Sequence, residues 1–183
     1  MNKFIPFAIL LVAVLLIGLA TYNLKQKQEI SAVHDNQEYG VHFVKTQIAL
    51  PEFTLADLFD DKKQFSKKDL LGKYSIVNFF ASWCATCRAE HEVLLRLQSE
   101  HFIDIYGVAW RDISANTKSY LEKSGNPFTQ VAIDSSGLFT KLGGIEAIPE
   151  TWIVNKEGVV IARFRGNLQT FSIDEIKNFI NQN

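Results

Sequence analysis

The sequence predicts one α/β domain with a central sheet of mixed strand direction and helices packed against it. Two observations carry this prediction. The chain has 183 residues, of which 47% are hydrophobic and 21% charged, enough for one substantial core. Segments typical of strands alternate with segments typical of helices, and the last two strands form a hairpin that precedes a final helix, which is typical of a mixed α/β sheet.

The strand and helix patterns follow one another without internal repeats. The segment 75–81 contains Ile76, Val77, Phe79 and Phe80, a nearly continuous apolar run expected of a central strand buried on both faces. The predicted strands are 53–55, 75–81, 103–110, 128–133, 151–155 and 159–165, and the predicted helices are 66–72, 84–99, 114–123, 138–142 and 173–180.

The N-terminal segment predicts a membrane anchor at residues 1–24. Residues 4–20 carry no charge and follow Lys3. As a helix they span about 26 Å, and continuing to Leu24 reaches about 31 Å, which matches a hydrocarbon core of roughly 30 Å. We therefore expect residues 4–24 to contact membrane lipid. The alternative is a cleaved signal peptide, because Gly18-Leu19-Ala20 is a tolerable cleavage site.

A polar tether at 25–45 is expected to join this anchor to a globular domain at 46–183. Lys3 favours an N-terminus inside the cell, whereas Lys25 and Lys27 weaken that bias. A cysteine pair suits an oxidising compartment, so we expect the domain to be exported. The formal net charge of -1 and the lack of a long Lys/Arg run argue against nucleic acid as a partner.

The only two cysteines, Cys84 and Cys87, predict a redox-active pair. The predicted strand 75–81 leads directly into the helix that starts at Cys84, where the helix macrodipole lowers the pKa of a thiol and stabilises the thiolate. Cys84 is therefore the expected nucleophile. Cys87 lies one turn further, close enough for a reversible disulfide, and is the expected resolving thiol.

Three other interpretations of the pair fit the sequence less well. A c-type haem site would need histidine after Cys87, and that position is Arg88. A zinc site would need two more ligands, and the chain offers four histidines and no second cysteine pair. An inert structural disulfide would close almost no loop and would therefore add little stability. We expect no metal and no cofactor.

Two motifs give the chain a family resemblance. The segments 78–91 (Asn-Phe-Phe-Ala-Ser-Trp-Cys-Ala-Thr-Cys-Arg-Ala-Glu-His) and 143–151 (Gly-Gly-Ile-Glu-Ala-Ile-Pro-Glu-Thr) resemble the thiol:disulfide interchange proteins of bacterial cytochrome c maturation, the DsbE/CcmG type. The resemblance runs from about Pro51 to the C-terminus. It implies a thioredoxin-like fold with an extra strand and helix inserted at 128–142. The family often has proline after the first cysteine and this chain has Ala85, so the family's redox potential cannot be carried over.

The same resemblance assigns expected roles to Ile148, Pro149, Glu90 and Glu150, whereas Trp83 and His91 are interpreted from their residue types alone. Pro149 should follow a cis peptide bond beside the disulfide and leave the backbone of Ile148 free to pair with a substrate strand. Glu90 matches the family's active-site acid, and the alternative is a solvated helix carboxylate. Glu150 resembles an acidic residue of the family, and the alternative is a simple charge at a strand start. Trp83 shields the disulfide and contacts substrate, or else is a core aromatic. His91 is expected to be a packing or surface residue.

The resemblance also implies a function. The chain would be a membrane-anchored thiol:disulfide oxidoreductase of the bacterial inner membrane, single pass, with its catalytic domain in the periplasm. It would reduce apocytochrome c before haem attachment and be recharged by a membrane thiol reductant of the DsbD/CcdA type. The alternatives are a general periplasmic disulfide reductase and a non-enzymatic adaptor in the haem attachment complex.

Overall fold

A computed structural model describes residues 17–19, 21 and 40–183. The chain divides into two units, Met1–Tyr39 and Gly40–Asn183. Residues 17–19 and 21 are helical, and among the described residues no helix is long and apolar enough to cross a membrane. Most of the predicted anchor and of the predicted tether lies outside the described residues.

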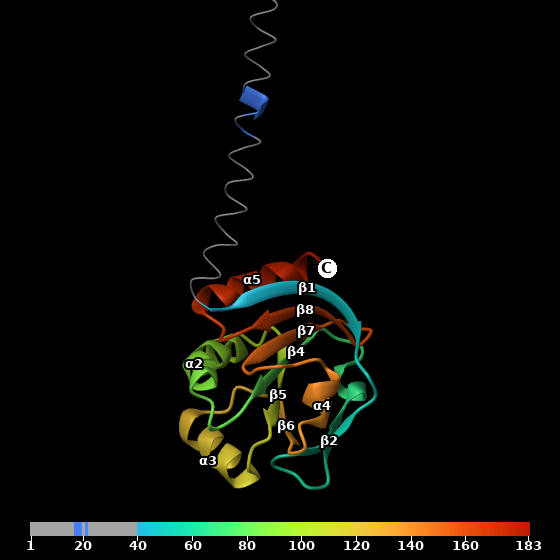
Figure 1. The fold of residues 1–183 in the computed structure, drawn as a ribbon, viewed down its shortest axis with the longest axis vertical. Coiled ribbons are helices and arrows are strands. Elements are labelled where there is room, and N and C mark those ends of the chain that lie inside the picture. The colour runs from blue at the N-terminus through green and yellow to red at the C-terminus, as the bar shows by residue number, and fades with distance from the viewer. Residues whose placement is uncertain (1–16, 20, 22–39) are drawn as a thin grey trace, which may run out of the picture. The chain divides into compact units, whose positions relative to one another are not determined.

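The unit Gly40–Asn183 is built on a mixed sheet with the strand order β1-β8-β7-β4-β5-β6-β2-β3 (Figure 1). Strands β4, β5 and β6 pair in parallel, and the other neighbours pair antiparallel. The predicted mixed sheet is therefore confirmed. The strands are β1 (His42–Ala49), β2 (Thr54–Asp57), β3 (Gln64–Ser66), β4 (Ser75–Phe80), β5 (Asp104–Trp110), β6 (Gln130–Asp134), β7 (Glu150–Val154) and β8 (Val159–Arg165).

Helices cover both faces of this sheet (Figure 1). They are the 3₁₀ helix η1 (Lys67–Leu70) and the α-helices α2 (Ala85–Ser99), α3 (Ser114–Ser124), α4 (Leu138–Leu142) and α5 (Thr170–Asn181). Side chains of β4 alternate between two cores. Ile76 and Phe80 pack with residues of α2, α3 and α5, whereas Val77 and Phe79 pack with residues of α4 and η1. The central-strand prediction is confirmed, because every residue of β4 is buried.

Three parts of the sequence prediction need correction. The tether was expected to reach residue 45, but β1 begins at His42, so residues 42–45 belong to the sheet. β1 was not predicted, because it is an edge strand with mostly exposed side chains and an irregular register between Lys45 and Ile48. It therefore lacks the alternation of apolar and polar residues that indicates a half-buried strand. Strand β3 was not predicted, because it has only three residues. The helix expected at 66–72 is the four-residue η1.

The predicted insertion is present as β6 followed by α4. Asp134, the last residue of β6, accepts hydrogen bonds from the backbone nitrogen of Thr140 at 2.8 Å and from its hydroxyl at 2.6 Å. This buried carboxylate fastens α4 to the end of its strand. The chain then reaches Gly143 and the segment that leads into β7.

Candidate active site

Cys84 and Cys87 form a disulfide at the start of α2. Their Cα atoms are 5.3 Å apart. Cys84 is the N-cap residue of the helix, and its Sγ accepts a hydrogen bond from the backbone nitrogen of Cys87 at 3.1 Å. An N–H directed at Cys84 Sγ stabilises negative charge there, in addition to the helix macrodipole. The predicted pairing and the position of Cys84 at the helix N-terminus are confirmed.

The turn between β4 and α2 is held by two side chains that the sequence did not single out. Asp112 is buried and accepts hydrogen bonds from the backbone nitrogen of Ser82 at 2.6 Å, from its hydroxyl at 3.0 Å and from the hydroxyl of Thr117 at 2.9 Å. Arg88 donates to the carbonyl of Ser82 from Nε at 3.0 Å and from Nη2 at 2.6 Å. Ser82 is thereby fixed two residues before Cys84.

Pro149 lies beside the disulfide, after a cis peptide bond with Ile148. The expected cis bond is confirmed. The carbonyl oxygen of Ile148 is 3.9 Å from Cys84 Sγ, and the carbonyl of Pro149 accepts from the backbone nitrogen of Gly166 at 3.0 Å. The structure thus brings residue 148 to the edge of the cysteine pair. Pairing of its backbone with a substrate strand stays a prediction.

Glu90 is fully buried, on the second turn of α2. Its Oε1 accepts from Nδ2 of Asn78 at 2.8 Å, and its Oε2 accepts from the backbone nitrogen of Leu168 at 2.7 Å. Burial raises the pKa of Glu90 to about 8, although both hydrogen bonds act in the opposite direction. The alternative of a solvated carboxylate is wrong. A buried acid that titrates near neutral pH, one turn from Cys87, can take up or release a proton during exchange.

Asn78 connects Glu90 to the strand that follows Pro149. It is buried in β4 and donates from Nδ2 to the hydroxyl oxygen of Thr151 at 2.9 Å as well as to Glu90. In the sequence, Asn78 stands only as the first residue of the motif at 78–91. A polar residue in the middle of a largely apolar, fully buried strand was the available signal, because buried polar groups need partners.

Glu150 is a buried ion-pair partner and not a simple charge at a strand start. Its Oε1 accepts from Nε of Arg163 and, at 2.7 Å, from Nε1 of Trp152. Arg163 also donates from Nη2 to the carbonyl of Gly144 at 3.0 Å. Glu150 and Arg163 therefore connect both ends of the segment that carries Ile148 and Pro149. Contact between Glu150 and substrate stays a prediction.

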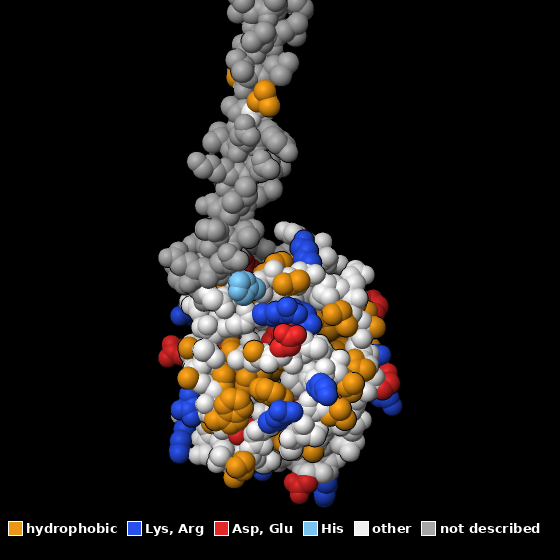
Figure 2. Space-filling view, in the orientation of Figure 1, with side chains coloured by type: hydrophobic (Ala, Val, Ile, Leu, Met, Phe, Trp, Pro, Cys, Tyr) orange, Lys and Arg blue, Asp and Glu red, His pale blue; other side chains and the backbone are white. Residues whose placement is uncertain are grey.

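Trp83 is 57% exposed, so the alternative of a core aromatic is wrong. Its ring centroid lies 6.2 Å from that of Trp110. Other large hydrophobic side chains are also exposed on the described domain, among them Leu138 at 58% and Leu142 at 62%. Figure 2 shows patches of hydrophobic side chains between Lys and Arg side chains on the face that carries α4. Such surfaces are typical of proteins that bind other proteins.

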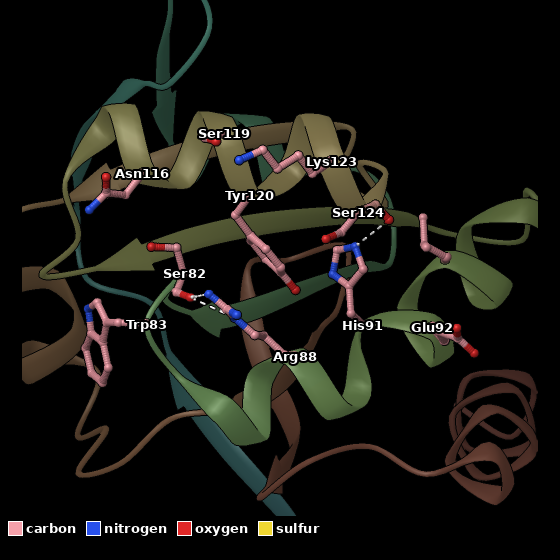
Figure 3. A pocket seen from close by; sticks show the side chains of 11 residues that line it. Ser82, Trp83, Arg88, His91, Glu92, Asn116, Ser119, Tyr120, Lys123 and Ser124 are labelled. Atoms are coloured by element: carbon pink, nitrogen blue, oxygen red, sulfur yellow. Dashed lines mark hydrogen bonds between the residues drawn. The ribbon is translucent and has the colours of Figure 1, made fainter.

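A groove of about 750 Å³ runs between α2 and α3 and ends at Trp83 (Figure 3). Arg88 and Tyr120 point into it from the two helices, and the Arg88 guanidinium lies 5.6 Å from the centre of the Tyr120 ring. Burial raises the pKa of Tyr120 to about 12. His91 packs against the same ring at 5.0 Å between centroids and lies 3.2 Å from the carbonyl of Ser124, so it is a packing residue. Within the described residues, no group of three or more His, Cys, Asp or Glu side chains is placed to hold a metal ion.

Comparison with known proteins places this site in a family. Residues 45–180 match the family model described as Redoxin. The chain belongs to the Redoxin family. A DsbE thiol:disulfide interchange protein of Allochromatium vinosum is 36% identical over 110 residues, which is 60% of this chain and 61% of that protein. A protein of the same name from Pasteurella multocida is 29% identical over 175 residues, or 96% of this chain and 93% of the relative.

Solved structures support the same fold for this Redoxin-family chain. A thiol:disulfide interchange protein of the thioredoxin family from Chlorobium tepidum superposes with a TM-score of 0.62 at 26% identity, covering 74% of this chain and 97% of that one. The thioredoxin-like fold and the resemblance to DsbE-type proteins are confirmed. The chain spans about three fifths of the length of the first curated relatives that it matches.

Proposed function

We propose that this chain is a thiol:disulfide oxidoreductase that exchanges disulfides with proteins through Cys84 and Cys87. The observation that carries the proposal is the disulfide at the N-terminus of α2, which lies beside the Ile148 carbonyl and the cis bond to Pro149. This arrangement places the sulfur of Cys84 at the helix terminus, where its thiolate is stabilised.

The exchange runs through a mixed disulfide. In the reduced enzyme the Cys84 thiolate attacks one sulfur of a substrate disulfide and displaces the other sulfur as a thiolate. Cys87 loses its proton and attacks Cys84 Sγ, which releases the second substrate sulfur and forms the Cys84–Cys87 disulfide. Two electrons and two protons pass to the substrate, which leaves as a dithiol.

Glu90 is the group best placed to handle the proton of Cys87. It lies three residues further along α2, and its raised pKa of about 8 lets it accept or return a proton near neutral pH. When charged, it also opposes formation of a second negative charge nearby, which limits the stability of the thiolate.

We further propose that the substrate is apocytochrome c and that the chain acts as its reductant. The support is the similarity to proteins named DsbE and the motifs at 78–91 and 143–151. The enzyme would then need a membrane thiol donor of the DsbD/CcdA type. A bacterial inner-membrane anchor formed by residues 4–24 would hold the domain on the periplasmic side, close to both partners. The alternatives are a general periplasmic disulfide reductase and a non-enzymatic adaptor.

A trapping experiment tests the proposal. Cys87→Ser removes the resolving thiol, so the enzyme should form a stable mixed disulfide through Cys84 with an oxidised peptide that carries Cys-x-x-Cys-His. Cys84→Ser is the matched control and should form little adduct. The adduct should disappear in reducing electrophoresis. An abundant adduct with Cys84→Ser and none with Cys87→Ser would reverse the roles of the two thiols.

Two further measurements separate the alternatives, trapping of a second peptide and cytochrome c assembly in a double variant. A general reductase would trap an unrelated disulfide peptide as fast as the Cys-x-x-Cys-His peptide. An adaptor would keep its role in cytochrome c assembly when both cysteines are replaced by serine. The proposal expects faster trapping of the Cys-x-x-Cys-His peptide and loss of assembly in the double variant.

A further inference from the structure

The side-chain amide of Asn78 has one end with two partners and one end with none. Both hydrogens of Nδ2 are used, by Glu90 Oε1 at 2.8 Å and by Thr151 Oγ1 at 2.9 Å. Oδ1 is buried and has no hydrogen-bond partner within the part of the chain that the structure describes. A buried acceptor without a partner is costly, so it needs a physical explanation.

The observed arrangement around Glu90 suits its charged form best. Each carboxylate oxygen faces a donor, Oε1 the amide of Asn78 and Oε2 the backbone nitrogen of Leu168 at 2.7 Å. A charged carboxylate only accepts hydrogen bonds, and both of these are therefore satisfied. A neutral carboxyl group carries a hydrogen on one oxygen, and neither the Asn78 Nδ2 nor the Leu168 nitrogen can accept it.

Rotation of the Asn78 amide by about 180° removes this conflict, because it exchanges the positions of Oδ1 and Nδ2. Oδ1 would then accept from a neutral Glu90 and from the hydroxyl of Thr151, which uses both of its lone pairs. The Leu168 nitrogen would still donate to Oε2. In the observed orientation the far end of the amide makes no hydrogen bond to the described residues that would hold it in place, so the proton on Glu90 decides between the two orientations.

We propose that Asn78 is a positioning residue whose amide turns with the protonation of Glu90, donating to the charged acid and accepting from the neutral one. The amide thereby stabilises both the charged and the neutral form of Glu90. An acid that accepts and returns a proton needs both forms to be stable. It also couples Glu90 to Thr151, which lies two residues beyond Pro149. The inference rests on the proposed function only in taking Glu90 as the acid of the site.

The groups that face Glu90 are compatible with this behaviour. Asn78 comes from β4, Thr151 from β7 and the backbone nitrogen of Leu168 from the segment before α5. Cys87 lies one turn back on α2, and from α3 the charge of Glu90 contributes to the raised pKa of Tyr120. No ion pair to Glu90 is present among the described residues, and burial places its pKa at about 8, so both forms are populated near neutral pH.

Nuclear magnetic resonance of the oxidised full-length chain in detergent tests the inference without any substrate. The side-chain amide resonances of asparagine are followed by ¹⁵N labelling and the carboxyl resonance of Glu90 by ¹³C labelling, from pH 5 to 10. The two amide hydrogens of Asn78 should shift with the same midpoint as Glu90. Relative to the intrinsic exchange rate at each pH, they should be less protected from exchange with water on the acidic side, where they lose their partners. In Glu90→Gln this titration should vanish.

Two variants complete the test. Asn78→Leu removes both orientations and should raise the midpoint of Glu90 by roughly one pH unit, because the hydrogen bond lost by the charged form is the stronger one. Ser75→Ala is the matched control, because Ser75 is also buried in β4 and its hydroxyl also has no partner among the described residues. It should leave the midpoint unchanged.

Asn78 hydrogens that do not respond while Glu90 titrates would overturn the inference, as would a response that persists in Glu90→Gln. Either result would leave disulfide exchange through Cys84 intact, since no exchange is measured. Conversely, loss of exchange activity would not change the outcome of this titration. The two proposals therefore fail separately.

Discussion

Two buried glutamates lie near the disulfide, and their partners differ. Glu150 faces the guanidinium of Arg163, so its charge is compensated inside the protein. Glu90 faces only neutral donors, the Asn78 amide and the Leu168 nitrogen. Two neutral hydrogen bonds do not offset the loss of water around a charge, which is why burial raises the pKa of Glu90. Glu150 is therefore suited to stabilise the fold, and Glu90 is suited to exchange a proton.

The raised pKa of Glu90 predicts a loss of stability toward alkaline pH. The folded state keeps the proton up to about pH 8, whereas the unfolded chain releases it near the ordinary value of 4.5. Between these values the folded state binds more protons, so the free energy of unfolding falls as pH rises. The total effect is on the order of 5 kcal/mol. Urea unfolding of the oxidised protein at pH 5, 7 and 9 measures it.

Glu90→Gln should remove this part of the pH dependence, because glutamine does not titrate. Glu92→Gln is the matched control, since Glu92 is exposed on the same helix, and it should keep the wild-type slope. Parallel stability curves for wild type and Glu90→Gln would show that Glu90 is charged in the folded protein throughout this range.

At the scale of single elements, helix α2 carries two opposing influences on the redox potential. Its N-terminus stabilises the Cys84 thiolate, and the Glu90 charge in the second turn opposes it. We expect a reducing enzyme with a potential nearer that of thioredoxin, about −270 mV, than that of DsbA, about −120 mV. Equilibration with glutathione or dithiothreitol measures the potential. A strongly oxidising value would contradict the proposed direction of electron flow.

Strand β8 positions the segment that carries Pro149, because Arg163 binds both Glu150 and the Gly144 carbonyl. Arg163→Met should lower the free energy of unfolding by roughly 3–5 kcal/mol, since it leaves Glu150 buried without its cation. Adding Glu150→Gln should recover part of this loss, because the two residues act as a pair. Denaturant titration of both single variants and the double variant measures the coupling. Additive losses would show that the pair does not act as a unit.

The sequence predicted the elements with strong patterns and missed those without them. The apolar run of β4 and the helix that starts at Cys84 were recognised because burial on both faces and a cysteine at a helix terminus leave local signals. Strand β1 left none, since it is an edge strand with mostly exposed side chains and an irregular register. The same limit applies to the site. Asp112, Arg163 and Leu168 reach it only through tertiary contacts.

At the scale of the whole molecule, the proposed function needs the domain to stay near the membrane. The domain Gly40–Asn183 has its own core clusters and its own sheet. Attachment would therefore depend on the N-terminal segment, whose uncharged stretch at 4–20 is a property of the sequence. Membrane retention and disulfide exchange should be separable by substitution.

Replacing Leu11 and Val14 by arginine should release the full-length chain from the membrane. Both positions lie near the middle of the predicted span, where each arginine costs roughly 2.5–3.5 kcal/mol. Wild type should remain in the pellet after alkaline carbonate extraction, and its domain should be open to protease in spheroplasts. Leu11→Ile with Val14→Leu keeps the segment apolar and should behave as wild type. A soluble wild-type protein that begins near Thr21 would show that the segment is a cleaved signal peptide, because the uncharged stretch would then serve export alone.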